Sequence, residues 1–186
     1  GVGLDSVDIP AATRAGVLVA NIPSVGTGNA ESVAEFAIAH MLMLSRHIPT
    51  AFEQFREKRV GSPLGGCLWQ STVVILGYGG IGEEIARRLA GFGTRIIAVS
   101  RHGPNGPRPR DPSVHLDRHV GVNEMDDALG EADYVVVAAP ASPENIGLVD
   151  ASVFAHMKPG TYIVNIARGP VIDYDALLAA LRDGRV

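Results

Sequence analysis

The stretch "VILGYGGIGEEIARRL", residues 74–89, decides the fold of this chain. An apolar run ends at three spaced glycines, and an amphipathic pattern at helical spacing follows them. A strand, a G-x-G-x-x-G loop and a helix in this order are typical of a loop that holds a pyrophosphate. Gly77 permits the tight turn, Gly79 lets the backbone approach the phosphates, and Gly82 lets the helix pack closely on the sheet. The stretch therefore predicts a dinucleotide-binding loop.

The same alternation continues to the end of the chain. Apolar runs at 72–76, 95–100, 133–140 and 161–167 are separated by helical patterns at 81–92, 123–132, 150–157 and 173–184. Continuous apolar strands that alternate with helices predict an α/β fold, a Rossmann-type doubly wound parallel sheet with both faces covered. Before this region we expect a long helix over 32–46, ended by Pro49, and no long element over 50–70. Asp150 and Asp173 are predicted helix caps.

Composition narrows the class of protein. The chain has 186 residues, a net charge of −4 and 46% apolar residues, enough for a packed core. A pI near 5.8 without a basic block argues against nucleic-acid binding. Cys67 is the single cysteine, so we expect no disulfide framework, no metal site and a reducing, cytoplasmic setting. No apolar run is long enough for a membrane span. The first residue is glycine rather than methionine, so we expect a part of a longer protein.

The residues after the second predicted strand indicate which dinucleotide binds. An acidic residue at this position usually binds the ribose 2′-hydroxyl of NAD, but here Ser100 and Arg101 stand in its place. A carboxylate would repel a 2′-phosphate, whereas Arg101 would attract one and Ser100 could donate a hydrogen bond. Arg108 and Arg110 follow in a Pro/Gly-rich loop. We therefore predict NADP as the cofactor, with NAD as the alternative.

Three stretches resemble one family. They are "GVGLDSVD", "NAESVAEFAIAHMLMLSR" and "MKPGTYIVNIARGPVID", and together with the glycine loop they resemble the D-isomer-specific 2-hydroxyacid dehydrogenases. The third follows the family signature M-K-x-G…N-x-x-R-G…V-D. The resemblance implies that residues 1–25 are a remnant of a flavodoxin-like substrate domain. It implies that residues 26–186 are an NAD(P)-binding Rossmann domain, incomplete at its C-terminal end.

The resemblance also implies roles for particular residues. Arg168, just past a parallel strand, would be the catalytic arginine, which holds the carboxylate of a 2-oxo acid and polarises its carbonyl. Its glutamate and histidine partners would lie outside this chain, and the six histidines present are expected to be structural or solvated. Val2, Gly3 and Asn29 would contact substrate, although Ala30 departs from a common Leu-Thr pair. The expected cofactor-binding residues are Gly77, Tyr78, Gly79, Gly80, Ile81, Gly82, Ser100, Arg101, Ala139, Pro140, Asn145, Ile166 and Ala167.

The expected function is that of an oxidoreductase that transfers hydride between NADP(H) and a small 2-oxo or 2-hydroxy acid such as glyoxylate or hydroxypyruvate. Two alternatives stay open: a dinucleotide-sensing module like the corepressors of the same superfamily, and a formate or phosphite dehydrogenase, to which Asn29 points. This chain by itself is expected to be inactive, because the proton donor would lie outside it. The apolar stretch "EFAIAHMLML" predicts a homodimer, since relatives dimerise through this region.

Overall fold

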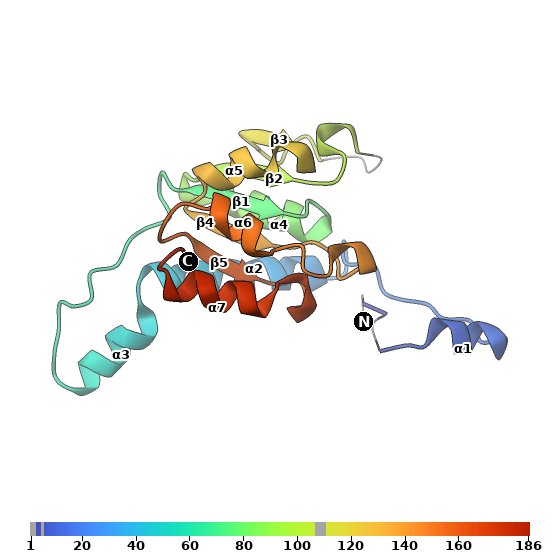
Figure 1. The fold of residues 1–186 in the computed structure, drawn as a ribbon, viewed down its shortest axis with the longest axis horizontal. Helices are drawn as coiled ribbons and strands as arrows, with labels where there is room; N and C mark the ends of the chain where they lie inside the picture. The colour runs from blue at the N-terminus through green and yellow to red at the C-terminus, as the bar shows by residue number, and fades with distance from the viewer. Residues whose placement is uncertain (1–2, 5, 107–110) are drawn as a thin grey trace.

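The computed structural model of the chain describes residues 3–4, 6–106 and 111–186. Within them the centre is a five-stranded sheet of order β3-β2-β1-β4-β5, in which each neighbouring pair is parallel (Figure 1). The strands are β1 (Thr72–Leu76), β2 (Arg95–Val99), β3 (Arg118–Val120), β4 (Tyr134–Val137) and β5 (Tyr162–Asn165). The order reverses at β1, which confirms the predicted doubly wound sheet of the Rossmann type.

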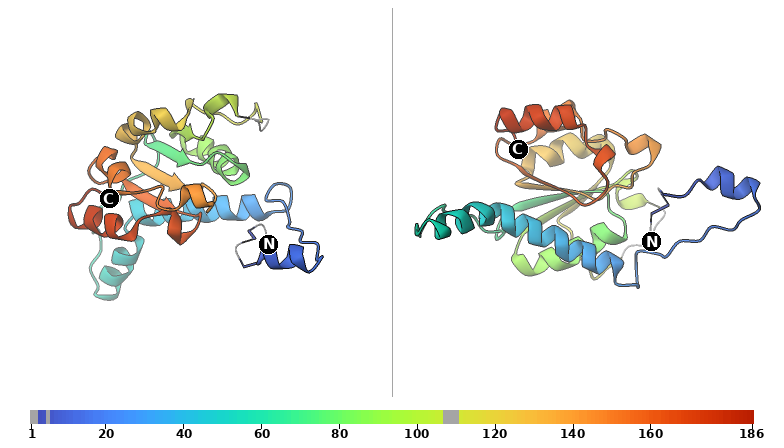
Figure 2. Two further views of the ribbon diagram at one scale, coloured as in Figure 1. Left: turned by 45° about the vertical axis from the view of Figure 1, so that its right-hand side comes forward. Right: turned by 90° about the horizontal axis from the view of Figure 1, so that it is seen from below.

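Helices cover both faces of the sheet (Figure 2). On β1, Val73 and Ile75 pack toward α2 (Asn29–Ser45) and α4 (Gly80–Leu89). Val74 and Leu76 point the other way, because successive strand residues alternate in direction. Their cluster includes residues of α5 (Met125–Glu131), α6 (Ala151–His156) and α7 (Tyr174–Arg182). These four β1 side chains are at most 2% exposed, so the centre of the sheet is buried as the apolar runs predicted.

Short 3-10 turns connect these elements: η1 (Ala90–Phe92), η2 (Gly103–Asn105), η3 (Val122–Glu124), η4 (Pro143–Asn145) and η5 (Gly169–Val171). Two predicted helix caps are confirmed. The Asp150 carboxylate accepts a hydrogen bond from the Val153 amide at 3.0 Å. The Asp173 carboxylate accepts bonds from the amides of Asp175 and Ala176 at 2.9 and 3.1 Å.

Two sequence predictions about local structure were wrong, and one strand was not predicted. The strand that was not predicted is β3, which pairs along the edge of β2 and needs no apolar run there. The long helix α2 begins at Asn29 instead of 32, because Gly28, at φ +80°, turns the chain directly into the helix. Pro49 does not end a helix: it lies in the first turn of α3 (Ile48–Arg56), where a missing N–H costs nothing. The break between the two helices falls at His47, whose φ is +49°.

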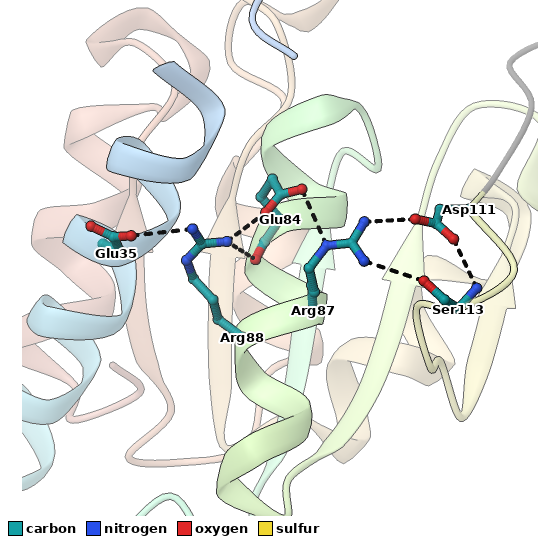
Figure 3. A network of polar contacts seen from close by, with 6 residues as sticks. All are labelled: Glu35, Glu84, Arg87, Arg88, Asp111 and Ser113. Carbon is teal, nitrogen blue, oxygen red and sulfur yellow. Dashed lines mark hydrogen bonds and ion pairs between the residues drawn. The ribbon is translucent and has the colours of Figure 1, made fainter. Parts of the chain in front are cut away.

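A chain of ion pairs fixes α4 against its neighbours (Figure 3). Arg88 of α4 bonds to Glu35 of α2 at 3.1 Å and to Glu84 one turn earlier. Arg87 bonds to Glu84 and, at 2.8 Å, to Asp111 in the segment before β3. Hydrogen bonds from Arg87 and then Ser113 lower the pKa of Asp111 to about 2. Burial raises the pKa of Glu84, but the hydrogen bonds from Arg88 and Arg87 outweigh it and lower the pKa. These contacts hold α4 against α2 on one side and against the segment before β3 on the other.

Two segments stand away from the sheet (Figures 1 and 2). Near the N-terminus, α1 (Ile9–Arg14) contains no buried residue, and Leu18 after it is 98% exposed. On the opposite side, α3 and the loop that follows it extend from α2, and α3 also contains no buried residue. Both segments carry apolar side chains that the sheet domain does not cover. The domain boundary predicted after residue 25 stays a prediction.

Candidate functional site

The expected cofactor residues follow the carboxyl ends of four strands. The segments directly after β1, β2, β4 and β5 carry residues 77–82, 100–101, 139–140 and 166–168, respectively, and the first of these includes the start of α4. Parallel strands place their carboxyl ends at one edge of the sheet, so these segments share that edge. The reversal of strand order lies at β1, between β2 and β4. A ligand crevice is expected outside this point in open α/β sheets.

The glycine loop is built from close backbone contacts. Gly77 has φ +103°, and a Cβ added there would lie 2.5 Å from the backbone nitrogen of Ala139 in the loop after β4. A Cβ at Gly82 would lie 2.5 Å from the carbonyl oxygen of Gly77. Neither position accepts a side chain without backbone movement. These two glycines therefore bring the β1 loop, the β4 loop and the start of α4 into direct contact.

The N-terminus of α4 is open to a ligand. Its N-cap residue, Gly79, makes no side-chain capping bond, and the first intrahelical bond in this turn runs from the Glu83 amide to the Gly79 carbonyl at 2.9 Å. The N–H groups of the first helical turn have no intrahelical partner, and the helix dipole adds positive potential there. This cradle fits a pyrophosphate. The contacts would come from backbone, since Tyr78 is only 6% exposed and its ring packs in the core beside His119, with ring centroids 5.2 Å apart.

The loop after β2, which is expected to face the adenosine, combines a half-buried hydroxyl and an exposed cation. The Ser100 hydroxyl lies 2.9 Å from Nε2 of His119 and 3.3 Å from the carbonyl oxygen of Gly103. The guanidinium of Arg101 is 63% exposed and lies 3.9 Å from the Glu144 carboxylate of η4. The pKa of Glu144 is lowered, first by a hydrogen bond from Ser142 and also by the charge of Arg101. The predicted helpers Arg108 and Arg110 lie outside the described residues.

The loop after β4 is closed by one amide side chain. Nδ2 of Asn145 donates a hydrogen bond to the carbonyl oxygen of Pro140 at 2.8 Å. Ala139, packed against Gly77, is 6% exposed, and Pro140 is exposed. Asn145 therefore stabilises the loop after β4. This structural role was not predicted, and the predicted contact of Asn145 with the cofactor stays a prediction.

A second amide shapes the arginine loop. Oδ1 of Asn165, at the end of β5, accepts a hydrogen bond from the Ala167 amide, and its Nδ2 donates to the Arg168 carbonyl, both at 3.0 Å. Ile166 and Ala167 are half-buried against opposite faces of the sheet. The Arg168 side chain is exposed, and its guanidinium donates to the Ala167 carbonyl at 2.9 Å. Asn165 was not among the predicted site residues, although it is the asparagine of the N-x-x-R-G pattern in the sequence.

Of the expected substrate residues in the first part of the chain, the structure describes Gly3 and Asn29. Val2 lies outside the described residues, and Gly3 is exposed. Asn29 is the first residue of α2 instead of a loop residue, and Ala30 beside it is fully buried. An open cavity of about 660 Å³ lies between α2 and the arginine loop. Its lining residues are Ser32, Val33, Glu35, Phe36, Ala39, Asn165, Ile166 and Ala167.

The described residues contain neither a cluster suited to a metal ion nor a helix suited to a membrane span. Residues 3–4, 6–106 and 111–186 contain no cluster of three or more His, Cys, Asp or Glu side chains placed to hold a metal ion. No helix in this part of the chain has the length and apolar character needed to cross a bilayer.

The sheet order, the glycine cradle and the open helix N-terminus define the class of domain: a nicotinamide-dinucleotide-binding domain of the Rossmann type. Residues 38–186 match the family model described as D-isomer specific 2-hydroxyacid dehydrogenase, NAD binding domain. The chain belongs to this family, as the sequence resemblance predicted.

Known proteins support this assignment. The chain is 41% identical to a D-3-phosphoglycerate dehydrogenase of Mycobacterium tuberculosis, over 100% of this chain and 34% of that protein. It is 35% identical to a glyoxylate reductase of Thermococcus gammatolerans, over 98% of this chain and 54% of that protein. The solved apo-structure of D-lactate dehydrogenase from Escherichia coli superimposes with a TM-score of 0.82 at 31% identity, over 100% of this chain and 56% of that one. The chain thus spans about a third to a half of the length of these relatives.

The close approach at Gly77 yields a prediction about stability. Gly77→Ala should destabilise the chain by roughly 2–5 kcal/mol, because it adds both backbone strain and an overlap with Ala139. Gly91→Ala is the matched control, since a Cβ there meets nothing within 4 Å and its φ is not left-handed. Urea unfolding followed by circular dichroism measures both variants. Equal stability of the two variants would show that the loops separate at little cost.

Proposed function

We propose that this chain is the cofactor-binding part of an oxidoreductase that transfers hydride between NADP(H) and a small 2-oxo or 2-hydroxy acid. The glycine cradle against the open start of α4 carries the dinucleotide part of the proposal, because its backbone donors fit a pyrophosphate. The bound nicotinamide would supply or accept the hydride. The names of the relatives, which include a glyoxylate reductase, support an acid of this class.

Arg168 is the residue of this chain that we assign to the acid. Its guanidinium is exposed at the carboxyl end of β5, and one of its contacts is a hydrogen bond to the neighbouring Ala167 carbonyl. A carboxylate can displace that neutral acceptor, because charge-assisted bidentate pairs are stronger than bonds to a carbonyl. The same planar fork of N–H donors can polarise the carbonyl of a 2-oxo acid. The amide of Asn165 holds the backbone on both sides of this contact.

The charges of the residues after β2 favour NADP over NAD. Ser100 and Arg101 carry no negative charge there, and the guanidinium is exposed to solvent. Glu144 lies close enough to attract Arg101, so a bound 2′-phosphate competes with this carboxylate for the same cation. The competition reduces the preference without reversing it, because the phosphate carries more charge than the carboxylate.

Turnover of the whole protein that carries this chain tests the reaction. NADPH oxidation is followed with glyoxylate and hydroxypyruvate, and NADP⁺ reduction with D-3-phosphoglycerate. Arg168→Ala should lower kcat/KM by about 10²–10³-fold with the accepted acid, because a preorganised donor is lost. Arg168→Lys should recover little, since an ammonium lacks the fork. NADPH affinity should stay unchanged in both variants. Absence of turnover in the parent with all three acids would count against this substrate class.

Nucleotide titration of the chain tests the cofactor. The parent should bind NADPH more tightly than NADH, and Arg101→Asp should raise the Kd of NADPH by about tenfold while leaving that of NADH near its parent value. Arg182→Asp, an equal charge change on α7, is the control and should alter neither Kd. If the parent bound the two nucleotides equally, the NADP assignment would be wrong.

We also propose that the chain forms a homodimer through α2 and α3. Phe36 on α2 and Phe52 and Phe55 on α3 are 61%, 63% and 68% exposed, more apolar area than isolated surface residues account for. A cavity of about 290 Å³ beside Phe36 and β5 offers room for a partner side chain. Light scattering on a sizing column should give twice the 19.5 kDa of one chain. Phe55→Glu should give the monomer mass, and Leu181→Glu on α7 should not. A monomeric parent would contradict the proposal.

A further inference from the structure

The hydroxyl of Ser100 has two polar neighbours and one proton to share between them. Nε2 of His119 lies 2.9 Å from it, and the carbonyl oxygen of Gly103 lies 3.3 Å from it. The backbone of Ser100 is fixed as well, because its amide donates to the Val120 carbonyl at 3.1 Å and its carbonyl accepts from the Gly103 amide at 3.1 Å. The hydroxyl therefore has a defined position, and its neighbours decide where its proton points.

The register of the sheet brings His119 to this position. On β3, His119 pairs with Ala98 of β2, so both side chains leave the same face of the sheet. Ser100 is two residues beyond Ala98 and shares that face. The ring of Tyr78, buried after β1, packs beside the imidazole. His119 is thus held between a packed ring and the serine, and its Nε2 is directed at the hydroxyl.

The pair of Ser100 and His119 has two states, which differ in whether Nε2 of His119 carries a proton. If Nε2 carries no proton, it is an acceptor, and the serine donates its proton to the imidazole over the shorter distance. The hydroxyl then turns only lone pairs toward a ligand, and these repel a phosphate oxygen. If Nε2 carries a proton, it donates to the hydroxyl oxygen. The serine proton then points to the Gly103 carbonyl over a long 3.3 Å bond, which a phosphate oxygen can replace.

We propose that His119 is a positioning residue for NADP: it donates its Nε2 proton to Ser100, so that the serine hydroxyl is free to donate to the 2′-phosphate. This inference rests on the proposed function, because it concerns the same cofactor site. The effect is specific to NADP, since the 2′-hydroxyl of NAD both donates and accepts and can bond to the serine in either state.

Titration of the chain with NADPH and with NADH tests the inference. His119→Phe keeps a ring against Tyr78 but removes the donor that fixes the serine hydroxyl oxygen, so the side chain can rotate away from the 2′-phosphate. This variant should raise the Kd of NADPH about tenfold while changing that of NADH less than about twofold. His119→Gln places an amide N–H near the position of Nε2 and should restore most of the NADPH affinity. In a Ser100→Ala background, His119→Phe should have no further effect, because the histidine acts through the serine.

Three results would overturn the inference. The first is that His119→Phe binds NADPH with the Kd of the parent. The second is that it raises the Kd values of NADPH and NADH equally. The third is that it raises the Kd of NADPH as much in the Ser100→Ala background as in the parent. In each case a parent that still prefers NADPH, and loses this preference in Arg101→Asp, leaves the proposed function standing. A parent without that preference overturns the proposed function and this inference together.

A measurement on the parent chain covers the case in which His119→Phe does not fold. Two-dimensional ¹H–¹⁵N correlation of the imidazole nitrogens distinguishes protonated from unprotonated Nε2. We expect the Nε2 of His119 to carry a proton in the complex with NADP⁺. An unprotonated Nε2 in that complex would contradict the donor role directly.

Discussion

The close contact between the loops after β1 and β4 is the constraint on which the rest of this structure depends. The site of a Cβ on Gly77 lies 2.5 Å from the nitrogen of Ala139, so the two loops pass at backbone distance. The same glycine lies under the first turn of α4, where its carbonyl excludes a side chain from position 82. The helix can therefore begin directly at the carboxyl edge of the sheet, where its first N–H groups have no intrahelical partner. Salt bridges from Arg87 and Arg88 hold that orientation on both sides.

Much of the fold could be predicted from the sequence because parallel strands buried on both faces must be apolar along their whole length. The runs that became β1, β2, β4 and β5 had this property in their central residues. The strand β3 did not, since it has three residues and lies at the sheet edge, where His119 can be half-buried beside Ser100. The start of α2 was missed for a different reason. Whether Gly28 and Asn29 form a loop or a helix start depends on a φ of +80° that no apolar spacing reveals.

For the site, the sequence predicted where the residues lie more accurately than what their side chains contact. Residues after the strand ends do share one edge, since that follows from the topology alone. What their side chains do depends on distant partners: Tyr78 packs beside His119 in the core, Asn145 bonds the Pro140 carbonyl, and Asn165 braces the arginine loop. A polar side chain in a loop has many possible partners, and the tertiary register selects among them. The assignments of Tyr78 and Asn145 as cofactor contacts therefore stay predictions, whereas their structural contacts are seen directly.

The two polar groups at the adenosine end differ in how firmly they are held, and this decides their relative weight. Arg101 is 63% exposed and already lies 3.9 Å from Glu144, and exposed ion pairs of this kind contribute about 0–1 kcal/mol. Ser100 is half-buried and fixed by Val120, and a hydrogen bond from such a group to a charged ligand contributes roughly 1.5–3 kcal/mol. In the proposed NADP complex, the arginine would thus act mainly by attracting the phosphate as it approaches, an effect that salt screens within about 10 Å. The hydroxyl would act on the bound state, so the proposed discrimination between the two nucleotides depends more on the direction of one serine proton than on a nearby positive charge.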